Sequence, residues 1–438
     1  MSFTHSSSGN VRGAFRYVPS SILTATLLIT TIASGPAGAA GSGSTGDQKQ
    51  SPANTDSTFR AANYKPAVLR LGFTSTMPAT GTKKDAGSFL DLTLIPASGQ
   101  LQGYRVDVTA QEIGLLLKEL YGQLARQEPL NTSNPESPAR RLYDILIRPV
   151  AAELQRTSTT TLLISADQGL QAVPYAALHD GNRYFGDTYA FSITPSIGLT
   201  LQATQQLFER QSRMAAGASR FATLSPLPLV PQELKGVTNS PSSTIGKAYL
   251  NEAFTPSTLI STSAHPDITQ VHIATHAEFM PGGPSRSRLY TGTTPMSLRE
   301  FAQLRQRREG KQLQLITLSA CRTALGDKDS ELGFAGLALQ AGSRSAIGSL
   351  WYVDDAVTTA YFVLFYQYLD KGYPKAEAMQ KVRQALLHDL IRVDSNRLLG
   401  PEEQVLIQDL SSDQQRRLQQ GTSNPYYWSG IELTGTPW

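Results

Sequence analysis

The run Val271-His272-Ile273-Ala274-Thr275-His276 decides the class of fold, together with a second run, LQLITLSAC, from Leu313 to Cys321. Each is a short apolar segment that ends at a side chain able to do chemistry. Short segments that are apolar on both faces are typical of buried strands in a parallel sheet covered by helices. Functional residues gather just past the carboxyl ends of such strands, so His276 and Cys321 are the first candidates for a site.

Further strands and helices follow the same pattern. Short apolar strands are expected at residues 161–164 and 346–350, and strong helices at residues 355–369 and 374–390. Ser297 and Glu300 form a capping box that predicts the start of another helix between the two quoted runs. Strands that alternate with helices predict an α/β fold, with a mostly parallel central sheet flanked by helices.

A different pattern of apolar and polar residues precedes these alternating strands and helices. Residues 68–71, 89–94 and 104–108 predict a small group of half-exposed strands, since most of their apolar and polar residues alternate. Thr109 and Glu112 then form a capping box for a helix. We therefore expect a small N-terminal segment of strands and helix at residues 66–135, ahead of a main domain at residues 136–438.

The N-terminus predicts export. Arg12 and Arg16 precede an uncharged run from Ser21 to Ala33 and then a small-residue site, Ala37-Gly38-Ala39. This order is typical of a secretory signal peptide, expected here at residues 1–39. The apolar run is shorter than the roughly 20 residues that span a bilayer. An uncleaved anchor or a misassigned start codon is the alternative.

Residues 40–65 are rich in Gly, Ser, Thr, Asn and Gln, which predicts a disordered linker. We therefore expect a protein that is exported to the periplasm or the exterior and that keeps no stable membrane anchor after processing. The chain has 39 Lys and Arg against 35 Asp and Glu, a net charge of +4, without the basic stripe typical of nucleic-acid binding. We expect no nucleic-acid partner.

The chain has one cysteine, Cys321, so neither an intramolecular disulfide nor a multi-cysteine zinc site can form. A lone cysteine is commonly a small buried hydrophobe, and composition alone favours that interpretation. The alternative is a reactive thiol, which needs a base to take its proton. His276 lies 45 residues before Cys321, a spacing that fits one crossover helix between neighbouring strands. His272 lies inside the strand, where we expect it to be buried and structural.

Several runs, in order, resemble successive blocks of a CHAT domain, a caspase-like family. They include VHIATHAEF, LSACRTALGD, ELGFAGLALQAG, SAIGSLWYVDD and YYWSGIELTGTPW. The resemblance covers about Leu142 to Trp438. It implies a caspase-like sandwich and a cysteine endopeptidase in which His276 is the general base and Cys321 the nucleophile. It implies a protein or peptide substrate and neither a metal nor an organic cofactor.

The resemblance also implies finer roles. The backbone N–H groups of Ala277 and Cys321 would bind the oxyanion, although the family usually has glycine where Ala277 stands. Trp351 to Asp355 resembles a Trp-x-Val-x-Asp run of the related separases, which places Asp355 in a pocket for a basic residue. Asp354 is the next candidate. Asp355 could also be the N-cap of the following helix, and both roles could hold together.

Two functions therefore remain open. The first is a cysteine endopeptidase that cleaves after a basic residue. The second is a catalytically silent CHAT scaffold that binds a partner protein. The alanine at position 277 favours this second function.

Overall fold

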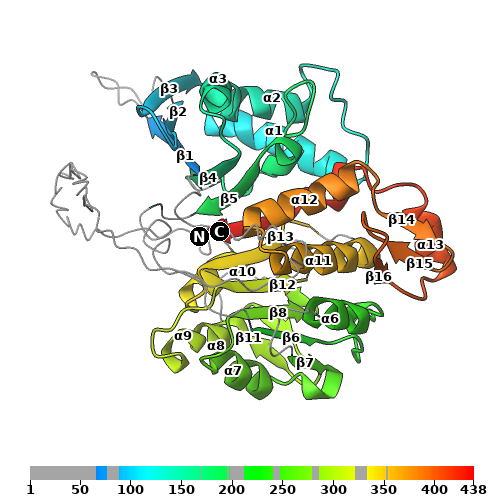
Figure 1. Cartoon of the computed structure of the whole chain (residues 1–438). Helices are drawn as coiled ribbons and strands as arrows, with labels where there is room; N and C mark the ends of the chain where they lie inside the picture. The colour runs from blue at the N-terminus through cyan, green and yellow to red at the C-terminus, as the bar shows by residue number, and fades with distance from the viewer. Residues whose placement is uncertain are drawn as a thin grey trace, which may run out of the picture. The chain divides into compact units, whose positions relative to one another are not determined.

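The computed structural model describes residues 66–75, 88–167, 169–194, 197, 212–239, 247–278, 286–320, 333–351 and 354–438. These residues belong to one compact unit, Ser57–Trp438. Within it, a large sheet of mostly parallel strands carries helices on both faces (Figure 1). The predicted α/β class is confirmed. Among the described residues, no helix combines the length and apolarity that a membrane span requires.

The large sheet has 11 described strands in the spatial order β3-β2-β1-β4-β5-β17-β13-β12-β8-β6-β7. In chain order these are β1 (Ala67–Ser75), β2 (Ser88–Ile95), β3 (Gln102–Asp107), β4 (Thr161–Ala166), β5 (Ala190–Thr194), β6 (Arg213–Gly217), β7 (Lys247–Leu250), β8 (Gln270–Ala274), β12 (Leu315–Ser319), β13 (Ser345–Ser349) and β17 (Ile431–Gly435). The three strands expected ahead of the main domain form one edge of this same sheet, because β1 pairs in parallel with β4. Antiparallel pairs join β1 to β2, β2 to β3 and β17 to β13.

The described helices are α1 (Ala110–Ala125), α2 (Pro138–Leu146), α3 (Arg148–Arg156), α4 (Phe185–Thr188), α6 (Val230–Thr238), α7 (Pro256–Ala264), α8 (Leu298–Ala302), α9 (Leu304–Arg307), α10 (Gly333–Gln340), α11 (Asp355–Asp370), α12 (Lys375–Leu387) and α13 (Ser412–Leu418). Short 3₁₀ helices cover Tyr175–Ala177, Asn251–Ala253 and Pro425–Tyr427. Both predicted capping boxes are present, at the starts of α1 and α8.

Alternate residues of each strand face different cores. In β12, Leu315 belongs to the core that contains residues of α6, α11 and α12, whereas Ile316 and Leu318 belong to the core with α7, α8, α9 and α10. The period of two along a strand produces this division. In Figure 1, α11 and α12 lie side by side, with α6 next to α11. The site described below lies at one end of the α6 and α11 layer.

Two small antiparallel sheets lie outside the large one. The first contains β9 (Ala277–Glu278), β10 (Arg288–Tyr290) and β11 (Pro295–Ser297), and the second contains β14 (Arg392–Asp394), β15 (Arg397–Leu399) and β16 (Val405–Ile407). The first sheet belongs to the crossover between β8 and β12. It begins at the residue that follows His276, so the crossover contains more than the single helix expected from the spacing.

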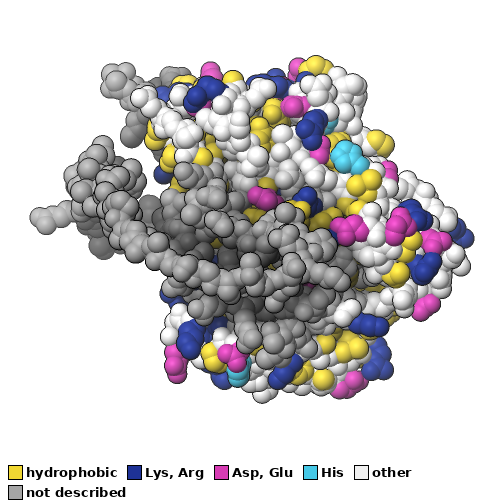
Figure 2. Space-filling view, in the orientation of Figure 1, with side chains coloured by type: hydrophobic (Ala, Val, Ile, Leu, Met, Phe, Trp, Pro, Cys, Tyr) yellow, Lys and Arg dark blue, Asp and Glu magenta, His cyan; other side chains and the backbone are white. Residues whose placement is uncertain are grey.

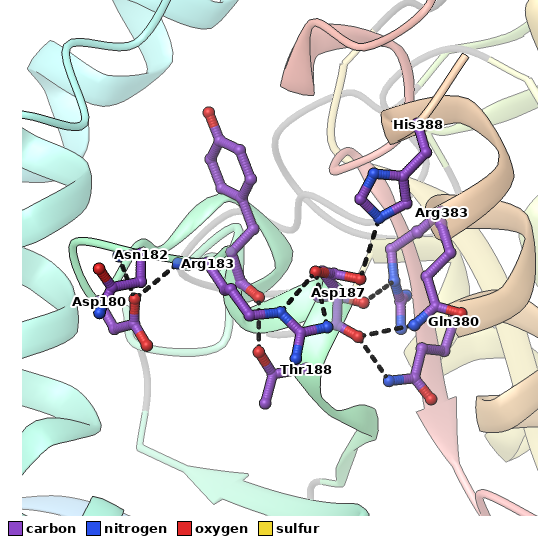
Figure 3. Close-up of polar contacts among 11 residues, drawn as sticks. Asp180, Asn182, Arg183, Asp187, Thr188, Gln380, Arg383 and His388 are labelled. Carbon is purple, nitrogen blue, oxygen red and sulfur yellow. Dashed lines mark hydrogen bonds and ion pairs between the residues drawn. The ribbon is translucent and has the colours of Figure 1, made fainter. Parts of the chain in front are cut away.

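Polar contacts tie α4, the short helix before β5, to α12 (Figure 3). The backbone oxygen of Asp187 accepts hydrogen bonds from the side-chain amides of Gln380, at 2.8 Å, and Gln384, at 2.9 Å. Its buried carboxylate accepts from Arg183 Nε at 2.9 Å. Because buried polar groups need partners, these contacts fix the position of α12 against this half of the sheet.

Candidate active site

The two strands at whose ends the sequence predicted the site are neighbours in the sheet. β8 and β12 pair in parallel, with Val271 opposite Ile316 and Ala274 opposite Ser319. The ladder continues one step further, since Thr275 N donates to the Ser319 backbone oxygen at 3.2 Å. His276 and Ala320 therefore leave the sheet at the same edge, as the spacing predicted. Cys321, the predicted nucleophile, lies outside the described residues.

The end of β12 is also fixed by β13, its neighbour on the side opposite β8. Ser349, the last residue of β13, donates from Oγ to the backbone oxygen of Ala320 at 2.6 Å. This hydrogen bond fixes the carbonyl that immediately precedes position 321. A rigid support of this kind is what a reactive group at a strand end requires, because a displacement of about 1 Å can cost about 100-fold in rate.

His276 is half-buried, and its ring is positioned by the segment between β6 and α6. Its Nε2 lies 2.8 Å from the backbone oxygen of Ser225, and the ring of Phe221 lies 4.7 Å away, centroid to centroid. A carbonyl oxygen can only accept, so Nε2 carries the hydrogen. In the neutral imidazole this leaves a lone pair on Nδ1 that can take a proton. The sequence analysis identified neither Phe221 nor Ser225.

Ala277, the predicted oxyanion residue, is the first residue of β9 and pairs with Leu289 of β10. It is not among the described residues with a positive φ. Only a positive φ would favour glycine over alanine here, so the backbone accommodates this departure from the family pattern without strain.

A pocket opens at this sheet edge, with an empty volume of about 600 Å³ that includes open solvent. Its lining contains strand-end residues of β8, β12 and β13 and one face each of α6 and α11. The lining residues are Leu227, Leu229, Val230, Glu233, Thr275, His276, Leu318, Ser319, Ala320, Ser349, Asp355, Thr358, Thr359, Phe362 and Ile431. The pocket thus brings His276 and Asp355 together, although they are 79 residues apart in the sequence.

The two adjacent aspartates have different surroundings. Asp354 is the N-cap of α11, accepting from the backbone N–H groups of Ala356 at 3.0 Å and Val357 at 3.4 Å, and it pairs with Arg417 Nε at 2.8 Å. Asp355 is the first residue of the helix and lines the pocket. The expectation that Asp355 could be the N-cap is therefore wrong, because Asp354 has that position. Burial, and then the neighbouring charge of Asp354, raise the pKa of Asp355.

His272 is fully buried inside β8, as predicted. Its Nε2 lies 2.8 Å from Oε1 of Glu233, which is 3% exposed. The rings of Phe362 and Tyr366 lie edge-on to the imidazole, at centroid distances of 5.2 Å and 5.4 Å. These contacts fit the structural role that we expected for His272.

Glu233 is a pocket residue that the sequence analysis missed. It lies on α6 among Val230, Leu234 and Val237, all of which are buried. A carboxylate within an apolar stripe at helical spacing is the signal that could have identified it, since such a group is seldom buried without a specific partner.

Two other features bear on possible ligands. Among the described residues, no group of three or more His, Cys, Asp or Glu side chains is placed to hold a metal ion. On the face shown in Figure 2, Lys and Arg side chains are interspersed with Asp and Glu over the described surface.

Comparison with known proteins gives one family. A family model described as the CHAT domain matches residues 136–436, more than half of the chain. The comparison with curated proteins found no match. Two crystal structures of the Saccharomyces cerevisiae separase–securin complex are similar, with TM-scores of 0.45 and 0.44 and sequence identities of 11% and 12%. Each comparison covers 86% of this chain and 30% of the separase chain.

Proposed function

Because this chain belongs to the CHAT family of caspase-like peptidases, we propose that it is a cysteine endopeptidase in which Cys321 and His276 act as a dyad. The observation that carries the proposal is the common edge of β8 and β12. There, a histidine with a fixed tautomer lies beside the strand that leads to the single cysteine. A thiol becomes a strong nucleophile when a positioned imidazole takes its proton.

The proposed reaction is acyl transfer. His276 takes the thiol proton at Nδ1 while the Cys321 sulfur attacks the peptide carbonyl carbon. The carbon–nitrogen bond then breaks, and the imidazolium returns its proton to the departing amine. Water, deprotonated by the same imidazole, attacks the thioester and releases the acid together with the free thiol.

The oxyanion of each tetrahedral intermediate needs hydrogen-bond donors. We assign this role to the backbone N–H groups of Ala277 and Cys321. Such donors stabilise the charge that develops in the transition state, and removing one typically costs about 100-fold to 1,000-fold in kcat. The side chain at position 277 takes no part in this contact, so alanine supports the chemistry as glycine does.

Substrate preference is proposed to depend on Asp355. A partly buried carboxylate at a pocket wall is destabilised by lost hydration, and a substrate cation that joins it offsets this cost. The raised pKa of Asp355 reflects that lost hydration. We therefore propose cleavage after Arg, and less efficiently after Lys, because Arg can bind both carboxylate oxygens.

Peptide hydrolysis by four proteins tests the proposal: wild type, Cys321→Ala, His276→Ala and the double variant. Two groups that act as a unit lose activity non-additively, so each single variant should be about as inactive as the double. Full hydrolysis by folded Cys321→Ala would contradict the dyad. Folded wild type that hydrolyses no peptide but binds a partner protein would favour the silent scaffold.

We further propose that the protein is exported. The support is in residues 1–39, which lie outside the described residues and whose order of charged, apolar and small residues is that of a signal peptide. The predicted linker at residues 40–65 also lies outside the described residues.

A further inference from the structure

Glu233 is a buried carboxylate whose two described hydrogen-bond partners are His272 and Thr359. Oε1 accepts from the imidazole of His272 at 2.8 Å, and Oε2 accepts from the hydroxyl of Thr359 at 3.3 Å. Among the described residues, no Lys or Arg lies within ion-pairing distance of Glu233, whose one ion-pair contact there is with His272. A buried carboxylate without a cation is costly, because hydrogen bonds replace only part of its lost hydration.

His272 is poorly placed to supply the missing positive charge. Its second ring nitrogen, Nδ1, is buried and has no hydrogen-bond partner among the described residues. A protonated ring would bury a charged N–H group there without an acceptor, which costs more than an unpaired acceptor. The neutral ring with hydrogen on Nε2 satisfies the contact to Glu233 and avoids that cost. Ionised Glu233 therefore has no internal counter-ion among the residues that the structure describes.

Glu233 shares the pocket with Asp355. The pocket-lining residues of α11 are Asp355, Thr358, Thr359 and Phe362, which lie on one helical face at spacings of three, four and seven. Thr359, which contacts Glu233, lies four residues beyond Asp355, or roughly 6 Å along the helix axis. Asp355 and Glu233, which contacts Thr359, thus line one pocket, with Leu229 and Phe362 among the apolar groups around them.

We propose that Glu233 is a second specificity-determining residue, and that Glu233 and Asp355 together bind the guanidinium group of a substrate arginine. A guanidinium is planar and carries five N–H donors, so it can bind two separated carboxylates at once, whereas an ammonium is a compact point charge. The inference rests on the proposed function only in taking the cation to be a substrate side chain. Binding of the cation itself requires neither Cys321 nor peptide hydrolysis.

Calorimetric titration of the full chain with n-butylguanidinium tests this directly. n-Butylurea, a neutral analogue of similar shape, serves as the reference ligand. Wild type should bind the cation at least about ten-fold more tightly than the urea, and Glu233→Gln should reduce this preference at least about ten-fold. The control variant, Glu119→Gln, removes an exposed carboxylate of α1 and should leave the preference unchanged. An unchanged preference in folded Glu233→Gln would overturn the proposal.

A second variant decides the question if Glu233→Gln does not fold. In Asp355→Asn, Glu233 remains, so some preference for the cation over the urea should persist. Complete loss of the preference in folded Asp355→Asn would show that Glu233 contributes nothing to binding. The peptidase assay is independent of both titrations. A protein without peptidase activity that keeps the Glu233-dependent preference refutes the proposed function alone, and an active peptidase without that preference refutes this inference alone.

Discussion

Nε2 of His276 lies 2.8 Å from the backbone oxygen of Ser225, and this contact sets the chemistry of the imidazole. The carbonyl acts as the orienting acceptor that a catalytic histidine requires. Because the acceptor is a backbone atom, any residue at position 225 can supply it. The packed ring of Phe221 adds a side-chain constraint on the same imidazole.

The two histidines of the VHIATH run should respond differently to substitution. His272→Ala should lower the free energy of unfolding by about 2–4 kcal/mol, because it leaves a cavity and removes a donor from buried Glu233. His276→Ala should change it by less than about 1 kcal/mol, since the ring is half-buried. Urea denaturation of both variants provides the measurement. A folded, inactive His272→Ala beside an active His276→Ala would show that His272 is the base.

The adjacent aspartates make a matched pair for specificity. Asp355→Ala should reduce the preference for Arg at the cleavage site, lowering kcat/KM for such peptides by roughly 30-fold or more, the loss expected of one desolvated charge pair. Asp354→Ala should instead lower stability by about 1 kcal/mol through loss of the helix cap and keep the preference. Cleavage profiles on a peptide library measure both effects. Cleavage after Asp or after apolar residues in wild type would refute the role of Asp355.

The raised pKa of Asp355 predicts a dependence of stability on pH. Between the ordinary value of 3.8 and the raised value, the folded protein binds more protons than the unfolded chain, so stability falls as pH rises through this window. The ionised carboxylate therefore opposes folding at neutral pH. Asp355→Asn should raise the urea midpoint at pH 7, and the gain should vanish below pH 3.8. An equal gain at both pH values would show that ionisation of Asp355 is not its cause.

The export proposal has a simple test in the native host. Mass spectrometry of the mature protein should show an N-terminus shortly after Ala39. Recovery of an intact chain that keeps Met1 in the soluble cytoplasmic fraction would contradict it.

The sequence predicted the strands whose residues are large and apolar, and it missed others. The site strands were identified because runs such as LQLITL are almost wholly apolar. β6 reads RMAAG, whose small residues give little hydrophobic signal although every one is buried. β17 pairs between β5 and β13, which precede it by more than 80 residues, and local patterns cannot indicate such a partner.

In the site too, the sequence indicated the residues whose type carries a chemical signal and missed those whose type does not. His276 and Asp355 carry side chains whose chemistry can be read from their type and position. The orienting acceptor for His276 is the backbone oxygen of Ser225, which no residue type indicates. Sequence reasoning placed Asp355 at the pocket, where it lies, but also allowed it as the helix N-cap, which is Asp354, because one residue of helix phase decides between the two positions.

The rate of covalent labelling reports whether His276 activates Cys321. An acyloxymethyl-ketone peptide with a terminal Arg should label Cys321 of the wild type, as shown by mass spectrometry of the digested protein. His276→Ala should lose nearly all of this labelling, while iodoacetamide should still alkylate its thiol once the protein is unfolded. Equal labelling rates in the wild type and folded His276→Ala would show that His276 does not activate Cys321.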